Sequence, residues 1–125
     1  MGEENSESLS ILVVEDDPIL RDLLIEELNE AGFSCTPAGS GDEAWAIMEK
    51  SSVDCLISDL AMQDSSGADL IEKTRKDSRF KSLPIIISSG VLDITEEKAL
   101  KMGANKLFIK PFLVEDLVRS IQEIS

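Results

Sequence analysis

Several carboxylate residues follow an apolar run near the start of the chain, and one more carboxylate stands at the end of a later apolar run. The stretch ILVVEDDP, residues 11–18, places Glu15, Asp16 and Asp17 directly after four apolar residues. Asp59 ends the run DCLISD in the same way. Several carboxylate oxygens together suit Mg²⁺, which takes about one or two protein carboxylates, keeps several waters and leaves positions for a phosphate. These acids therefore indicate a cation site with phosphoryl-transfer chemistry.

Two groups that complement a phosphate follow later apolar runs. Ser89 comes after LPIIIS, and Lys110 comes after NKLFI. A hydroxyl donor and an ammonium charge supply what the remaining oxygens of a phosphoryl group need. Asp17 is set apart from these candidates, because Asp17-Pro18 is accounted for as a helix cap followed by the first helical residue.

Gathering the acids is costly without a cation. Two carboxylates about 4 Å apart repel by roughly 4 kcal/mol at an effective dielectric constant of about 20. Glu15, Asp16 and Asp59 would form several such pairs, whereas the net stability of a domain is only about 5–15 kcal/mol. The energies favour a bound divalent cation, which we expect to be Mg²⁺.

Short apolar runs alternate with segments of helical period along the chain. Strands are expected at residues 11–14, 33–37, 54–59, 83–88 and 105–109. Helices are expected from Asp17-Pro18, from Ser40 to about Ser51, near 66–77, over 94–102 up to Gly103, and after Pro111. Apolar strands separated by helices require a parallel sheet covered on both faces, with right-handed crossovers. The expected fold is α/β: a flavodoxin-like, doubly wound (βα)5 three-layer sandwich with a five-stranded parallel sheet in the order 2-1-3-4-5.

In such open sheets, ligands bind outside the carboxyl ends of the strands, near the point where strand order reverses. Every candidate residue follows the end of an expected strand, so the sequence predicts that they meet at one edge. The apolar helix faces are predicted to be core, including the leucine stripe of the first helix, Leu20, Leu23, Leu24 and Leu28. With this strand order the first strand separates Cys35 from Cys55, so no disulfide is expected between them.

Composition limits the partners. The chain has 25 acidic and 12 basic residues, no histidine and a formal charge of −13. Such a surface repels phosphate backbones and anionic lipid, so direct binding to nucleic acid or membrane is not expected. No run approaches the roughly 20 apolar residues that span a bilayer. Residues 1–8 are expected to be a disordered leader and 9–125 one domain with free thiols, in the cytoplasm.

Four motifs in this order, ILVVEDDP, LISDLAMQDSSG, LPIIISSG and FIKPF, resemble the receiver domains of two-component response regulators. The resemblance covers the chain after its first residues. It implies a signalling domain, not a conventional enzyme, that catalyses its own phosphorylation. The phosphodonor would be a histidine kinase or a histidine phosphotransfer protein. A homodimer that forms on phosphorylation is a further partner that we expect from the family.

The resemblance also implies a role for each matching residue. Asp59 would be the phosphoacceptor, and Mg²⁺ would be held by Glu15, Asp16, Asp59 and the backbone carbonyl of Ala61. Asp16 is expected to bind the ion directly and Glu15 through water.

Ser89 matches the hydroxyl that turns toward the phosphoryl group, and Lys110 matches the lysine that neutralises it. Gly67 and Pro111 fit the family's loop and its Lys-Pro bond, which is commonly cis. Phosphorylation would then switch the face made of the fourth helix, fifth strand and fifth helix.

The chain departs from the family at a few positions. Gln63 stands where a proline is frequent, and Leu107 where many members have an inward-rotating aromatic residue. Phe108 is expected on the opposite face of its strand. Apolar Ala61 and Val91 lack polar groups that could act on water, so slow self-dephosphorylation is expected.

Two other functions fit the motifs less well. A haloacid-dehalogenase-type phosphatase would need a second aspartate two positions after the nucleophile, where this chain has Ala61. A degenerate receiver, acting as an unphosphorylated interaction module, would lack the acceptor, the acid pair or the lysine, and none is missing. The sequence disfavours both readings.

Overall fold

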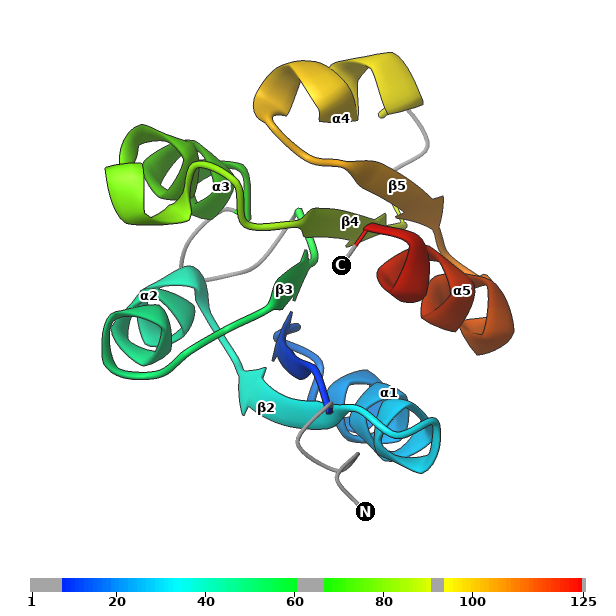
Figure 1. Ribbon diagram of the computed structural model, residues 1–125. Coiled ribbons are helices and arrows are strands. Elements are labelled where there is room, and N and C mark those ends of the chain that lie inside the picture. Colours follow the sequence, from blue (N-terminus) through cyan, green and yellow to red (C-terminus); the bar gives the residue numbers. More distant parts are fainter. Residues whose placement is uncertain (1–7, 61–66, 91–93, 125) are drawn as a thin grey trace.

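The computed structural model describes residues 8–60, 67–90 and 94–124. Within them, five parallel strands form one sheet in the order β2-β1-β3-β4-β5 (Figure 1). The strands are β1 (Ser10–Val14), β2 (Ser34–Ala38), β3 (Cys55–Ser58), β4 (Ile85–Ser89) and β5 (Lys106–Ile109). The predicted fold class and strand order are confirmed.

Helices cover both faces of the sheet. They are α1 (Pro18–Glu30), α2 (Gly41–Lys50), α3 (Gly67–Lys76), α4 (Glu96–Met102) and α5 (Val114–Ile124), with a short 3-10 helix η2 (Ser78–Phe80). Helices α1 and α5 lie on one face, and α2, α3 and α4 on the other (Figure 1). No helix among these is long and apolar enough to cross a bilayer. The leader predicted at 1–8 lies outside the described residues except for Ser8.

The core divides into two clusters because side chains alternate along each strand. On β1, Leu12 and Val14 pack toward α2, α3 and α4, whereas Ile11 and Val13 pack toward α1 and α5. All four are at most 1% exposed. A strand buried on both faces has no polar side to show, which is why the run ILVV is continuously apolar.

Side-chain hydrogen bonds cap α1 and α2 at the residues where the sequence predicts that these helices start. The Asp17 carboxylate accepts from the amides of Ile19 and Leu20, at 3.0 and 3.4 Å. The Ser40 hydroxyl accepts from the Glu43 amide at 3.1 Å. Helix α4 begins two residues later than predicted, at Glu96, because Thr95 is its N-cap.

The leucine stripe of α1 is only partly core, and the prediction was wrong for its first half. Leu28 is fully buried, but Leu20 and Leu23 are 44% and 51% exposed. Helix α1 begins at the carboxyl edge of the sheet, so its first turns lie where the strands have ended. Leu20 and Leu23 instead line a groove with the segment that follows β5.

The two cysteines lie on either side of β1. Ile11 is paired in register with Cys35 on one side and with Cys55 on the other. Both thiols are free, as expected from the two-strand separation. Burial raises the pKa of Cys35 to about 11, and burial together with the Asp54 charge raises that of Cys55 to about 12. Both therefore stay protonated, which makes them poor nucleophiles.

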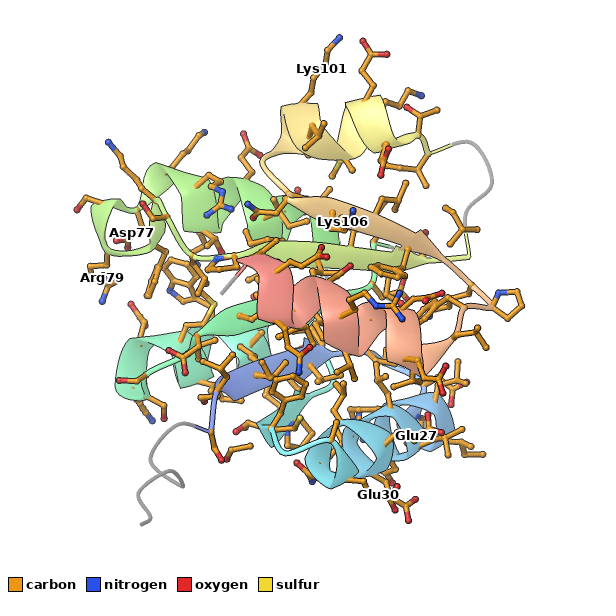
Figure 2. The ribbon with its side chains drawn as sticks, turned by 45° about the vertical axis from the view of Figure 1, so that its right-hand side comes forward. Glu27, Glu30, Asp77, Arg79, Lys101 and Lys106 are labelled. Carbon is orange, nitrogen blue, oxygen red and sulfur yellow. The ribbon has the colours of Figure 1, made fainter. Side chains whose placement is uncertain are left out.

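A 3-10 helix that the sequence did not predict connects α3 to β4. Its N-cap is Asp77, which accepts from the Arg79 amide at 2.9 Å and pairs with the Arg79 guanidinium at 2.7 Å (Figure 2). Hydrogen bonds from Arg79 lower the pKa of Asp77 to about 2. Since Arg79 is exposed and Asp77 partly exposed, this pair shapes the turn more than it stabilises the domain.

Arg75 connects the end of α3 to the loop before β4 and to the loop between α4 and β5. Its guanidinium donates to the carbonyls of Phe80, Lys81 and Gly103 at 2.9, 3.2 and 2.8 Å, and to the Asn105 side chain at 3.2 Å. Gly103, the left-handed residue after α4, lies against the Arg75 side chain. The carboxyl end of α4 is thereby anchored to α3.

Replacing Arg75 with methionine should destabilise the domain by about 2 kcal/mol, because several backbone carbonyls lose a charged donor. Lys76→Met is the matched control, since Lys76 is exposed on the same helix and pairs only with Glu72 among the described residues. Its effect should stay within about 0.5 kcal/mol. Urea unfolding measures both. Equal effects of the two variants would contradict the anchoring role of Arg75.

Candidate functional site

The candidate residues stand at the carboxyl edge of the sheet, where backbone hydrogen bonds continue past the strand ends. The Glu15 amide donates to Ala38 at 3.0 Å and the Asp59 amide to Val14 at 3.0 Å. The Lys110 amide donates to the Ser89 carbonyl at 2.8 Å. These bonds fix the backbones that carry the acids and the ammonium before any ligand is bound.

The acids meet as the sequence predicts. Glu15, Asp16 and Asp59 each present a carboxylate oxygen, and these oxygens all lie within 4.8 Å of one another. Glu15 is 7% and Asp59 9% exposed. Burial weakens the screening of their repulsion by water, so the cluster needs positive charge nearby.

Lys110 supplies part of that charge. Its ammonium lies 2.7 Å from a Glu15 oxygen and 3.3 Å from an Asp59 oxygen. Burial acts to lower the pKa of Lys110, but hydrogen bonds and charges of Glu15 and Asp59 outweigh it, and the pKa is raised. Lys110 is therefore cationic at neutral pH and bridges the strands β1 and β3.

The donor set fits Mg²⁺. The cluster has three carboxyl groups against one ammonium, and every ligand atom offered is a hard oxygen. Lys110 occupies one oxygen of Glu15, which is consistent with a water-mediated role for that residue. The predicted carbonyl ligand on Ala61 lies outside the described residues.

Ser89 lies at the same edge, as predicted. It is fully buried, ends β4 and is paired in register with Ile109, the residue before Lys110. The preceding Ser88 lies in the groove between α1 and the segment after β5, so alternation turns Ser89 toward the other face.

Alternation on β5 also confirms where its aromatic residue lies. Leu107 packs with the core cluster under α2, α3 and α4, whereas Phe108 packs with the core cluster under α1 and α5. The ring centroids of Phe108 and Phe112 are 5.3 Å apart. The Lys110-Pro111 bond is cis, as the resemblance implied. The departures at Gln63 and Val91 lie outside the described residues.

Gly67 packs directly against the backbone of the candidate phosphoacceptor. Its amide donates to the Leu60 carbonyl at 2.8 Å, and a Cβ added to it would collide with the Asp59 carbonyl oxygen. Only glycine fits this close approach.

Sequence reasoning missed Arg21. Its guanidinium nitrogen Nη1 donates to the Glu15 carbonyl at 3.1 Å, across six residues. A signal existed, because helical side chains point toward the helix N-terminus and Arg21 lies in an early turn of α1.

Gly67→Ala should cost about 2 kcal/mol of stability, because the colliding atom belongs to the backbone and cannot rotate away. Gly90→Ala is the matched control, since an added Cβ meets nothing within 4 Å there. Thermal and urea unfolding measure the difference. A Gly67→Ala variant as stable as Gly90→Ala would show that the loop relaxes freely.

Comparisons with known proteins identify the family of the chain. The family model of the response regulator receiver domain matches residues 11–122. The chemotaxis protein CheY1 of Helicobacter pylori is 32% identical over 121 residues, covering 93% of this chain and 96% of that protein.

Two solved structures are also similar. A putative response regulator from Chloroflexus aurantiacus has a TM-score of 0.88 and 30% identity, covering 94% of this chain and 98% of that one. The response regulator TrrA of Thermotoga maritima, solved in complex with Mg²⁺-BeF, has a TM-score of 0.84 and 28% identity. The match covers 94% of this chain and 99% of that one. The chain belongs to the response regulator receiver domain family, the phosphoacceptor signalling domains of two-component systems.

Proposed function

We propose that Asp59 is the phosphoacceptor and that Glu15, Asp16 and Asp59 hold Mg²⁺ beside it, with the Ala61 carbonyl as a further ligand. The observation that carries the proposal is the cluster of three carboxylates, two of which, Glu15 and Asp59, are bridged by Lys110. The domain would span residues 9–125 and work in the cytoplasm. A homodimer formed on phosphorylation is part of the same proposal.

The proposed step transfers a phosphoryl group from a phosphohistidine. An Asp59 carboxylate oxygen attacks phosphorus, a P–O bond forms, the P–N bond breaks, and its electron pair stays on the histidine nitrogen. Mg²⁺, when bound, supplies positive charge to the phosphoryl oxygens. Catalysis of this kind is mostly positioning and charge stabilisation, so a small signalling domain can perform it on itself.

Lys110 and Ser89 serve the new phosphoryl group in this proposal. The Lys110 ammonium leaves its pair with Asp59 for a phosphoryl oxygen, and the Ser89 hydroxyl donates to another. Both residues end strands that lead to α4 and α5, so their movement would bias the α4-β5-α5 face between two arrangements. Leu107 would accompany this change without an aromatic rotation.

The exposed apolar end of α1 supports a docking surface for the phosphodonor protein. Ile19, Leu20 and Leu23 are 78%, 44% and 51% exposed. A groove of about 330 Å³ runs from Leu20 and Leu23 to Glu15 and Lys110 of the site. A donor that must bring its phosphohistidine to Asp59 would bury this apolar surface.

The charge around the groove favours the same partner surface. Glu27 lines the groove, and Glu30 lies one turn further along α1 (Figure 2). Lys101 and Lys106 lie on α4 and β5, apart from α1 (Figure 2). A donor helix with an apolar stripe and a basic rim would therefore prefer α1.

Asp59→Asn should abolish phosphorylation, because the amide is a poor nucleophile. Incubation with Mg²⁺ and phosphoramidate, followed by intact mass, should add one phosphoryl group to the parent and none to the variant. Asp22→Asn is the control, since Asp22 is exposed on α1, and it should be phosphorylated like the parent. Phosphorylation of Asp59→Asn at the parent rate would refute the assignment.

Replacing Leu20 and Leu23 together with alanine should slow transfer from a phosphorylated histidine phosphotransfer protein about tenfold, since about 1.4 kcal/mol of lost burial has that effect. Transfer from phosphoramidate, which needs no docking, should be unchanged. Leu100→Ala is the control, because Leu100 is 58% exposed on α4. If the double variant were phosphorylated more slowly by both donors, or if Leu100→Ala slowed transfer equally, the donor protein would not dock on Leu20 and Leu23.

A further inference from the structure

We propose that Arg21 is a positioning residue of the cation site, which holds the peptide between Glu15 and Asp16 so that both acids face Asp59. The inference rests on the proposed Mg²⁺ site and concerns a residue that would touch neither the ion nor the phosphoryl group.

The contact that carries the inference is made to the backbone. Arg21 Nη1 donates to the Glu15 carbonyl oxygen at 3.1 Å. That oxygen belongs to the peptide group that joins Glu15 to Asp16. The hydrogen bond therefore fixes the orientation of this peptide plane, and with it the direction in which the Asp16 side chain points. The other side of the turn is held by the Asp17 amide, which donates to the Glu15 carboxylate at 3.2 Å.

Stability alone does not explain this guanidinium. Its Nε is buried and has no hydrogen-bond partner among the described residues. A buried donor without a partner destabilises the folded state, because it has lost its hydrogen bonds to water. An apolar side chain of similar length would avoid that cost, so the arginine points to a role in the arrangement of the acids.

The neighbouring loop leaves room for the guanidinium. A Cβ added to Gly39 would lie 3.1 Å from Arg21 Nη1 and 3.5 Å from a Glu43 oxygen. The same Glu43 oxygen accepts from the Gly39 amide at 2.7 Å, which holds the loop in place. Any larger residue at position 39 would press on Arg21 without removing its charge.

An electrostatic role and a positioning role of Arg21 predict opposite effects on the affinity for Mg²⁺ when the residue is replaced. Removing a positive charge near the acids would tighten binding of a cation if Coulomb attraction alone mattered. If Arg21 positions the acids, its removal weakens binding instead. The sign of the change therefore separates the two roles.

The test measures Mg²⁺ binding by isothermal titration. Arg21→Met should raise the dissociation constant about tenfold, as is typical when a residue that orients a metal ligand is lost. Arg21→Lys, which keeps the charge and can still donate to the carbonyl, should recover part of the affinity. Gly39→Ala should raise the dissociation constant in the same direction, by a smaller factor.

Arg119→Met is the matched control, because Arg119 is exposed on α5 and pairs with Asp116 at 3.2 Å. It removes the same charge and should leave the dissociation constant unchanged. Parent-like or tighter Mg²⁺ binding by Arg21→Met overturns the inference.

A readout without metal separates this inference from the proposed function. In the metal-free protein, the Asp17 amide should exchange its hydrogen faster in Arg21→Met than in the parent, because the turn is no longer held. If the parent binds no Mg²⁺, the proposed metal site fails, and this exchange rate still decides the positioning role. Unchanged exchange there overturns it.

Discussion

Repulsion among buried carboxylates is the constraint on which the rest of this structure depends. Three acids just past the ends of β1 and β3 have ligand oxygens that lie within 4.8 Å of one another, and each close pair can cost roughly 4 kcal/mol. One ammonium, on Lys110, offsets part of this repulsion. In the proposed Mg²⁺ site, the remaining negative charge would provide the affinity for a hard cation, and the domain would give up stability for that function.

The fold makes this concentration possible by joining distant parts of the chain. Lys110 is 95 residues from Glu15 and 51 from Asp59, yet it contacts both. Parallel strands bring their carboxyl ends to one edge, and the reversal of strand order at β1 and β3 opens the space above them. The ladder bonds that continue to Glu15, Asp59 and Lys110 then keep these backbones from moving apart.

Patterns with a period or a fixed local spacing could be predicted from the sequence. Apolar runs identified most of the strands, the pair Asp17-Pro18 identified the start of α1, and the acids at the strand ends predicted the carboxylate cluster. Arg21 was missed although its position in an early turn of α1 was a signal. The contacts of Arg75 could not be predicted, because a long side chain that reaches a carbonyl on a distant segment leaves no periodic pattern. Leu20 and Leu23 were misassigned for a related reason: helical period gives the face of a helix but not where the sheet beneath it ends.

The side-chain anchor of α4 among the described residues lies at its carboxyl end. Arg75 bonds hold Gly103 and Asn105, so the carboxyl end of α4 is tied to α3. The amino end of α4, capped by Thr95, follows Ser89 along the chain and has no comparable side-chain anchor among the described residues. A change that begins at Ser89 would therefore reach the unanchored end first, and α4 would pivot about Gly103 instead of moving as a whole.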